Sequence, residues 1–499
     1  MKENRCIMFV RRHGAVCLCA LICAAALIGA LCARAAAPAV MTDAQRREAG
    51  GSEYTLYCVM HPEDGTLAVR QEIVYENTTG DVLNSLVLRA WVNAFAQEET
   101  SPAATDELWD ACYQDAFSAG GIRLDGVWWQ ERPVSGYAFD DAAQTVLRVP
   151  VDALQPGEKG TLRVYYVIEL PLCNYRFGRT EAGWQLGNAF LILPRYENGA
   201  WRTDEYYPVG DPFVSDCAVW HVSLTLPEGV TPVGSCRFEK DGNGQWHGTA
   251  EAARDFALTL SNTQTVASRT FGGVTVTAAA PDEKSGQRAL ALCGKVLTTL
   301  TELYGPYPYA TLGISGVCFP FGGMEYPAYV MIGQNYMTDG ADEDTLELLL
   351  AHEIAHQWFY ALVGSDGYNQ PWQDEGLCQW ATLSYVRARY GSGAEESLRF
   401  YYVDAPMAEQ VPGSVTPGSP IDYFGSLDAY SSVVYGRGAA LCCALDTFLN
   451  GGLNGFLKAY CDQYAFSYCS RQAFEDALSA YAGQDVSPLI ADYLDTLMD

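Results

Sequence analysis

The sequence is poor in histidine and in basic residues. Six of its 499 residues are histidine, and 31 lysines and arginines stand against 60 aspartates and glutamates, which gives a formal net charge of −29 at pH 7. A surface of that sign repels phosphate backbones and argues against nucleic acid as a partner. We interpret the acidity as a solvated surface that keeps the protein soluble, rather than as a recognition patch.

Long apolar runs are also scarce, because only residues 15–33 are apolar for long enough to span a membrane. Four basic residues precede this run and Ala-x-Ala sequence follows it, as in a secretory leader. The sequence therefore predicts an exported protein, secreted or anchored on the extracytoplasmic face, with residues 1–37 as signal peptide or anchor and 38–52 as linker. The Ala-x-Ala sites favour cleavage, but the run also just spans a hydrocarbon core of roughly 30 Å, so a membrane tether stays open.

No regular cysteine spacing marks a disulfide framework. Five of the 17 cysteines fall in the predicted leader, and Cys442 and Cys443 are adjacent in an apolar segment. Buried free cysteine behaves as a small hydrophobe, so we expect few bridges. The sequence fixes neither a disulfide pattern nor an oligomeric state.

Hydrophobic periodicity divides the rest of the chain into two parts. Residues 53–267 alternate apolar and polar positions between turn signals, which predicts a large antiparallel β domain. Residues 268–499 change to a helical period, with a small sheet near 310–332, and we expect a mainly α domain. The expected helices cover residues 283–304, 345–363, 373–390, 437–449, 453–464, 471–482 and 487–498.

Two of the six histidines lie four residues apart. His352 and His356 enclose Glu353 in the sequence His-Glu-Ile-Ala-His, and Glu375 follows after eighteen intervening residues. Helical residues at i and i+4 share one face, so both imidazoles can reach one ion with Glu353 beside it. This pattern predicts a zinc site with its own general base.

Two helices are expected to carry these ligands. Asp344 is predicted as the N-cap of the first helix, which runs over residues 345–363 and carries a capping glutamate in its first turn. The second helix, 373–390, carries Glu375 in its first turn and ends before a glycine. A loop must fold the two helices together so that Glu375 reaches the third ligand position.

The donor set favours a catalytic zinc over a structural one. Structural zinc is usually closed by four cysteine or histidine ligands, whereas two histidines and one carboxylate leave a position for water. A solvated helix that holds these residues by chance is the competing interpretation, and the third carboxylate disfavours it. We expect one Zn²⁺ per chain, held by His352, His356 and Glu375, and attack by a zinc-bound water with Glu353 as general base.

Two further segments carry candidate site residues. One is the extended stretch of Gly322, Gly323, Met324 and Glu325, whose bare backbone could bind a peptide while the glutamate binds a cation. Glycines at a β-bulge would give the same sequence pattern, so this alternative stays open. A tyrosine of the segment 430–438 could donate a hydrogen bond to an oxyanion. With 31 tyrosines in the chain, composition alone does not select one.

These blocks occur in the order and spacing of one family. The chain resembles the aminopeptidase N and leukotriene hydrolase family of gluzincin zinc metallopeptidases, as a short bacterial-type member, over roughly residues 53–490. The blocks are Arg-Asp-Phe-Ala at 254–257, Gly-Gly-Met-Glu at 322–325, His-Glu-Ile-Ala-His-Gln-Trp-Phe at 352–359, Trp-Gln-Asp-Glu-Gly at 372–376 and Ala-Tyr-Ser-Ser-Val-Val-Tyr-Gly-Arg-Gly at 429–438.

The resemblance implies a fold and a set of roles. The fold would be an N-terminal antiparallel β saddle domain followed by a mainly α thermolysin-like zinc peptidase domain, with a substrate cleft between them. The implied roles are zinc ligands for His352, His356 and Glu375, general base for Glu353, oxyanion donor for Tyr435, α-amine binding for Glu325 within the substrate-binding block of Gly322, Gly323 and Met324, and a second active-site tyrosine for Tyr430.

The sequence also departs from the family pattern. Tyr326 stands where asparagine is common, Tyr360 replaces a frequent glycine, and the large helical C-terminal domain of longer relatives does not follow the catalytic domain. If that domain normally closes the cleft, we expect a more open site that accepts longer substrates. The predicted function is an aminopeptidase acting on peptides with a free N-terminus; the alternatives are an endopeptidase of the same mechanism and a catalytically silent zinc-containing peptide-binding protein.

Overall fold

The computed structural model describes residues 40–42, 45–46, 51–411 and 414–497. The predicted leader, 1–37, and most of the predicted linker, 38–52, lie outside these ranges. Within the described ranges, no helix combines the length and the apolar character needed to cross a membrane.

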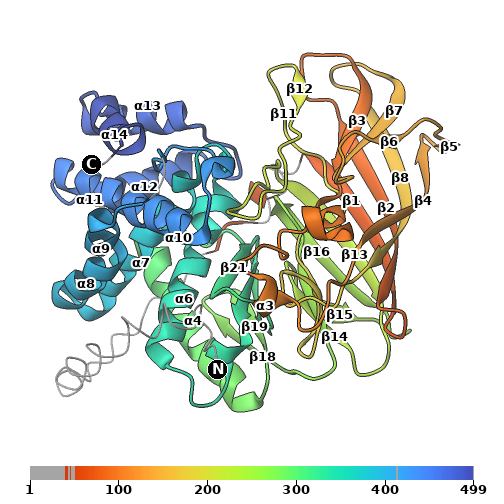
Figure 1. Cartoon of the computed structure of the whole chain (residues 1–499), viewed down its shortest axis with the longest axis horizontal. Helices are drawn as coiled ribbons and strands as arrows, with labels where there is room; N and C mark the ends of the chain where they lie inside the picture. Colours follow the sequence, from red (N-terminus) through yellow and green to blue (C-terminus); the bar gives the residue numbers. More distant parts are fainter. Residues whose placement is uncertain (1–39, 43–44, 47–50, 412–413, 498–499) are drawn as a thin grey trace. The chain divides into compact units, whose positions relative to one another are not determined.

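The first part of the chain is built mainly from strands (Figure 1), as the alternating pattern predicts. Its largest sheet is antiparallel except for one parallel pair, β1 with β13. Buried and half-exposed positions alternate along β2 and β8, so one face of the sheet packs on the core. In spatial order the sheet consists of β15 (Glu239–Lys240), β16 (Trp246–Ala253), β13 (Ala218–Thr225), β1 (Ser52–His61), β2 (Thr66–Glu76), β8 (Lys159–Glu169), β4 (Gly121–Trp129) and β5 (Arg132–Pro133).

Smaller sheets and short helices complete this part. Its core is rich in aromatic side chains, among them Trp220, which stacks on Tyr54 with ring centroids 4.0 Å apart. The sheets are β14 (Thr231–Gly234), β17 (Leu258–Ser261), β10 (Gly183–Leu186) and β9 (Phe177–Thr180); β3 (Leu83–Arg89), β7 (Val146–Leu154) and β6 (Ala138–Phe139); and β11 (Tyr196–Glu197) with β12 (Ala200–Trp201). The short helices are η2 (Trp91–Ala96), η3 (Glu98–Thr100) and α3 (Trp109–Cys112).

A five-stranded mixed sheet opens the second part. Its order is β18 (Thr265–Phe271), β19 (Val274–Ala280), β20 (Thr311–Val317), β22 (Tyr329–Gly333) and β21 (Gly323–Tyr326). β21 pairs antiparallel with β22 and is an edge strand. Figure 1 shows it near the helix α6 (Glu343–Ala355).

The remainder of the second part is mainly helical, in agreement with the predicted change of period. The α-helices besides α6 are α4 (Glu283–Tyr304), α5 (Gln334–Met337), α7 (Glu375–Tyr390), α8 (Ser392–Arg399), α9 (Ala405–Ala408), α10 (Leu427–Tyr430), α11 (Gly438–Phe448), α12 (Leu453–Gln463), α13 (Arg471–Ala482) and α14 (Ser487–Leu494). The shorter turns are η4 (Gln357–Leu362), η5 (Pro371–Gln373), η6 (Phe400–Asp404), η7 (Ile421–Tyr423) and η8 (Ser431–Arg437). The predicted domain limits, 53–267 and 268–499, stay predictions.

The start of α6 differs from the predicted one. Its N-cap is Asp342, whose carboxylate accepts from the Thr345 N–H at 3.0 Å, so the prediction of Asp344 is wrong. The predicted capping glutamate, Glu347, is buried and accepts hydrogen bonds from the phenols of Tyr385 and Tyr390 instead.

The end of α6 also differs, because the helix does not run to residue 363. It stops at Ala355 and continues into η4, where Phe359 and Tyr360 leave helical backbone angles. Arg254 of the first part donates to the Tyr360 carbonyl at 3.0 Å and to the Leu362 carbonyl at 3.4 Å. These bonds satisfy carbonyls that the helix releases, so a partner far away in sequence sets this boundary.

Candidate metal centre and active site

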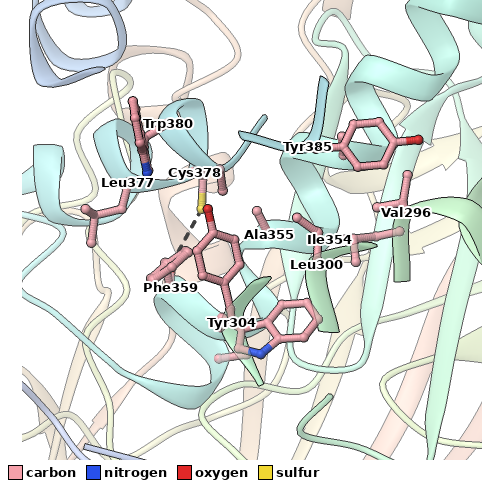
Figure 2. Close-up of a cluster of buried hydrophobic side chains, with 14 of the residues drawn as sticks. Val296, Leu300, Tyr304, Ile354, Ala355, Phe359, Leu377, Cys378, Trp380 and Tyr385 are labelled. Atoms are coloured by element: carbon pink, nitrogen blue, oxygen red, sulfur yellow. Dashed lines mark hydrogen bonds between the residues drawn. The ribbon is translucent and has the colours of Figure 1, made fainter. Parts of the chain in front are cut away.

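A packed core fixes the helix that carries the two histidines. Figure 2 shows Leu300 and Tyr304 of α4 close to Ile354 and Ala355 of α6, and all four side chains are buried. On the side of α7, the buried Cys378 thiol hydrogen-bonds to the Phe359 carbonyl at 3.8 Å. Close packing leaves α6 little freedom to rotate, so its histidines keep one direction.

The three predicted ligand groups converge. His352 Nε2 lies 3.1 Å from Glu375 Oε2, His356 Nε2 lies 3.3 Å from the same oxygen, and the two nitrogens are 3.3 Å apart. Ligand atoms held about 2.0–2.1 Å from a tetrahedral ion are about 3.3–3.4 Å apart. The triangle has the size and the donor chemistry of a zinc site, so the residues present fit the ion.

Neighbouring side chains hold the ligands in place. Asp374 Oδ1 accepts from His356 Nδ1 at 2.6 Å, and Gln379 hydrogen-bonds to His352. A proton on Nδ1 leaves the Nε2 lone pair of His356 directed at the triangle. Burial lowers the pKa of His352, which keeps that imidazole in the neutral form that binds metal.

Two further carboxylates lie beside the triangle without a partner. Glu353 and Glu325 are 5% and 6% exposed, and an oxygen of each lies within 4.8 Å of the other and of a His356 nitrogen. Among the described residues, neither carboxylate makes a hydrogen bond or an ion pair. Burial, opposed by His356, raises the pKa of Glu353 to about 8 and that of Glu325 well above its ordinary range. Such groups are suited to exchange a proton or to receive a cation.

The glycine segment forms the wall against which Glu353 rests. Gly322 and Gly323 are half-exposed, while Met324 beside them is buried. A Cβ atom built on Gly323 would lie 2.2 Å from Glu353 Oε1, far inside van der Waals contact. The edge strand β21 thus passes close to the glutamate because residue 323 has no side chain.

Both predicted tyrosines reach the site. The Tyr435 hydroxyl donates to Glu375 Oε1 at 2.6 Å, and its ring stacks on His352 with centroids 5.6 Å apart. Burial and the charge of Glu375 raise the pKa of Tyr435 well above its ordinary value, so the phenol keeps its proton and can donate. Tyr430 lies one layer further out, its ring 5.8 Å from that of Tyr435, and its hydroxyl faces Gly210. The segment 430–438, predicted to precede a helix, is itself helical through η8.

The sheet-rich part of the chain also lines the site. Asp211 and Phe213 join Glu325, Tyr360 and Asp374 around a cavity of about 10 Å³, measured by where the centre of a water molecule fits, which is room for about one water. This cavity adjoins Glu325 and does not include the three predicted ligands. The more open cleft expected from the sequence stays a prediction.

The two unusual tyrosines have different surroundings. Tyr326 donates to Asn188 Oδ1 at 3.1 Å, so it reaches into the sheet-rich part instead of the ligand triangle. Tyr360 lines the cavity together with Asp211 and Phe213, and its backbone carbonyl is one of those that accept from Arg254. The Tyr326 side chain thus adds a hydrogen bond between the two parts of the chain.

Three residues near the site were missed by the sequence analysis. Asp374 adjoins a ligand, and Gln379 follows Glu375 by one helical turn, so helix geometry could have suggested both. Asp211 is far from the motifs in sequence and lies in no recognisable pattern. Only the fold brings it to Glu325.

Zinc peptidases use two histidines and one carboxylate as metal ligands, with a second glutamate beside them as general base. Residues 289–493 match the profile described as the Peptidase family M1 domain. This match confirms the resemblance to the aminopeptidase N and leukotriene hydrolase family.

Curated relatives match less than half of the chain. Aminopeptidase M1-B from Oryza sativa subsp. japonica is 26% identical over 223 residues, which cover 41% of this chain and 25% of that protein. Leukotriene A-4 hydrolase from Xenopus laevis is 27% identical over 203 residues, which cover 38% of this chain and 32% of that protein. The matched region thus spans between a quarter and a third of the length of these relatives.

Solved structures resemble a larger share of the chain. The crystal structure of a mutant M1 zinc metallopeptidase from Deinococcus radiodurans has a TM-score of 0.60 at 16% identity, covering 90% of this chain and 95% of that one. A second structure of that mutant, bound to a Tyr-Ser-Ala substrate, has a TM-score of 0.59 at 15% identity. At this level of identity the likeness shows a shared fold: a sheet-rich first part followed by a helical part.

Proposed function

We propose that the protein is a zinc-dependent aminopeptidase that removes the N-terminal residue from peptides. The observation that carries this proposal is the buried, unpartnered Glu325 beside a zinc-sized triangle of ligand atoms. A carboxylate kept out of water without a partner is costly, and an entering ammonium group offsets that cost. The tripeptide bound by the structural relative is a substrate of the proposed size.

Each side chain has a defined task in this reaction. Zinc held by His352, His356 and Glu375 would polarise the peptide carbonyl and make a water molecule more acidic. Glu353 takes the proton of the attacking water and passes it to the leaving amine. The Tyr435 hydroxyl donates a hydrogen bond to the oxygen that becomes negatively charged.

Substrate binding follows from the edge strand and Glu325. An extended peptide can pair with the half-exposed backbone of Gly322 and Gly323, with Met324 and Tyr430 packed around it. Glu325 holds the α-ammonium, so that the first peptide bond lies at the ligand triangle. The proposal includes the finer fold description, a saddle-like β domain followed by a thermolysin-like domain.

The site in the described residues favours an exopeptidase over the two alternatives. A free N-terminus supplies an ammonium group that can enter beside the buried Glu325, whereas an internal segment of a peptide has none to place there. A silent binding protein has no need of Glu353 next to the ligand triangle. Export through residues 1–37 is also part of the proposal, and N-terminal sequencing of secreted material would test it.

Replacing the general base tests the reaction. Glu353→Gln should retain stoichiometric zinc but lose at least ~10²-fold in turnover of an aminoacyl amide, because the amide cannot accept the proton. Glu343→Gln makes the same change at the exposed start of α6 and should turn over normally. Near-normal turnover by Glu353→Gln, or activity of the wild type that survives complete zinc removal by a chelator, would contradict the proposal.

The role of Glu325 separates an aminopeptidase from an endopeptidase. Wild-type protein should cleave a peptide with a free N-terminus and leave the acetylated peptide intact. Glu325→Ala should weaken this discrimination, since the ammonium group loses its anchor. Internal cleavage of the acetylated peptide by the wild type would identify an endopeptidase.

A further inference from the structure

Two buried cysteines meet in the sheet-rich part of the chain. Cys112 is the last residue of α3, Cys173 follows β8, and each is 2% exposed. The Cys112 thiol hydrogen-bonds to the Cys173 thiol. Among the twelve cysteines that the structure describes, these two form the pair in which one thiol bonds to another. The contact therefore differs from the ordinary packing of a single buried thiol.

Backbone hydrogen bonds hold the two cysteines close together. Asn174, next to Cys173, donates its N–H to the Cys112 carbonyl at 2.9 Å. The Leu172 N–H, on the other side of Cys173, donates to Ser118 Oγ at 2.8 Å. Chains joined by such bonds lie about 4.8 Å apart in a sheet, and a disulfide bond needs Cα atoms about 4.4–6.8 Å apart. The two segments thus run close enough for the cysteines to be bridged without a large movement of the backbone.

Cys112 belongs to a long loop, residues 97–120, which joins η2 to β4 and which we call the α3 loop. A loop of this length needs attachments of its own, because ordering each of its residues costs conformational entropy. Its Glu107 accepts from the Leu427 N–H at 3.0 Å, at the start of α10, the helix that ends at Tyr430. The α3 loop therefore reaches from the sheet-rich part to the candidate active site.

Cys173 lies two residues before a side chain that supports the glycine segment. The Tyr175 ring packs edge to face on that of Phe321, the residue before Gly322, with centroids 5.6 Å apart. A bond between Cys112 and Cys173 would therefore join two pieces of chain that each contact the surroundings of the site.

We propose that Cys112 and Cys173 form a disulfide bond that fastens the α3 loop next to the candidate site. This inference goes beyond the proposed function, because it holds whichever peptide bond the site cleaves. Each thiol loses one proton and one electron as the new S–S bond forms. A low-molecular-weight disulfide, such as oxidised glutathione, takes up both electrons and both protons as its own S–S bond breaks to give two thiols. The bond closes the loop 112–173 and so restricts the unfolded chain.

Burial determines when this bond can form. The hydrogen bond to Cys173, together with burial, raises the pKa of Cys112 well above its ordinary value. The thiolate is the form that attacks a disulfide, so the thiols of the folded protein react slowly. We therefore expect the bond to form while the chain folds, before the two cysteines are buried.

Peptide mapping of the full chain tests the proposal. The chain is folded with zinc in a mixture of oxidised and reduced glutathione, alkylated, and cut with trypsin without reduction. Trypsin releases residues 90–123 and 164–176, each with a single cysteine, Cys112 or Cys173. We expect these two peptides to be joined, and to be alkylated separately after folding in reduced glutathione alone. Separate peptides from the oxidised preparation, or either one joined to another cysteine, would overturn the proposal.

Thermal unfolding measures what the bond does. The oxidised preparation should melt at least about 3 °C above the reduced one. Cys112→Ala/Cys173→Ala should abolish this difference, whereas Cys236→Ala, which removes another buried thiol of the same core, should keep it. If the double variant does not fold, the two wild-type preparations still give the answer. Equal melting temperatures for these, or a difference that persists in the double variant, would show that the bond does not fasten the loop. Neither measurement depends on catalytic activity or on export.

Discussion

Asp374 determines which nitrogen of His356 faces the ligand triangle. Its carboxylate accepts the Nδ1 proton at 2.6 Å in a buried setting. Such a bond also makes the opposite nitrogen more basic, so it strengthens metal binding through the imidazole. Asp374 therefore orients His356, and in the sequence only its position next to the ligand Glu375 suggests this role.

Removing the charge of Asp374 should weaken zinc binding without destroying the fold. We expect Asp374→Asn to raise the zinc dissociation constant roughly 10- to 100-fold, the usual effect of losing such a partner. Competition with a fluorescent chelator would measure the constant. Asp366→Asn serves as control in the same region of the chain, and an unchanged constant for Asp374→Asn would show that His356 does not depend on this bond.

Tyr435 already has an acceptor before substrate arrives. Its hydroxyl bonds to Glu375 Oε1, so it must exchange that partner for the carbonyl oxygen as negative charge develops. Tyr435→Phe should therefore lower kcat by about 10²-fold while KM changes little. Steady-state kinetics on an aminoacyl amide would measure both constants. A proportional rise in KM with unchanged kcat would mean that the phenol binds substrate and transition state equally.

The helices show which boundaries a sequence can predict. α4 and α13 begin and end at the predicted residues, and their N-caps, Asp282 and Ser470, adjoin the helices. The end of α6 and the helical turns of η8 could not be predicted in the same way. The kink after α6 depends on Arg254, which is distant in sequence. The hydrophobic periodicity of the α6 segment therefore could not predict the kink.

The strand β21 offers a test of packing between elements. A methyl group at Gly323 would collide with the flexible end of Glu353, which can move aside, so Gly323→Ala should displace the base more than it destabilises the fold. We expect turnover to fall at least about tenfold with zinc content unchanged. Gly393→Ala, in α8 with open space around it, is the control and should retain full turnover. Full activity of Gly323→Ala would show that the position of Glu353 tolerates such a shift.

On the scale of the whole molecule, the site lies where the two parts of the chain meet. Arg254 reaches η4, Arg202 pairs with Asp366 at 2.9 Å, and Tyr326 bonds to Asn188. The ligand triangle could be predicted because its residues belong to two consecutive helices. Asp211 could not, since its approach to Glu325 depends on how the sheets and helices pack.

Asp255 is a titratable group at this junction. Its carboxylate is buried and accepts from Asn188, which in turn accepts from Tyr326. Burial raises the pKa of Asp255 from 3.8 to about 7, although the Phe256 N–H, Asn188 and Arg176 oppose the rise. The folded protein therefore keeps a proton that the unfolded chain releases at lower pH. Linkage requires that stability from this group is present below about pH 4 and is lost as the pH rises through about 7.

Replacing Asp255 with asparagine should remove this dependence. The variant has no titratable group at position 255, so the difference in unfolding free energy between wild type and Asp255→Asn should shift against the wild type by up to roughly 4 kcal/mol as the pH rises from 4 to 8. Urea denaturation of both zinc-loaded proteins at several pH values would measure the difference. Because every other group is shared, its titration cancels in the comparison. Parallel curves would mean that the Asp255 carboxyl ionises as easily in the folded protein as in the unfolded chain, and that water reaches the junction.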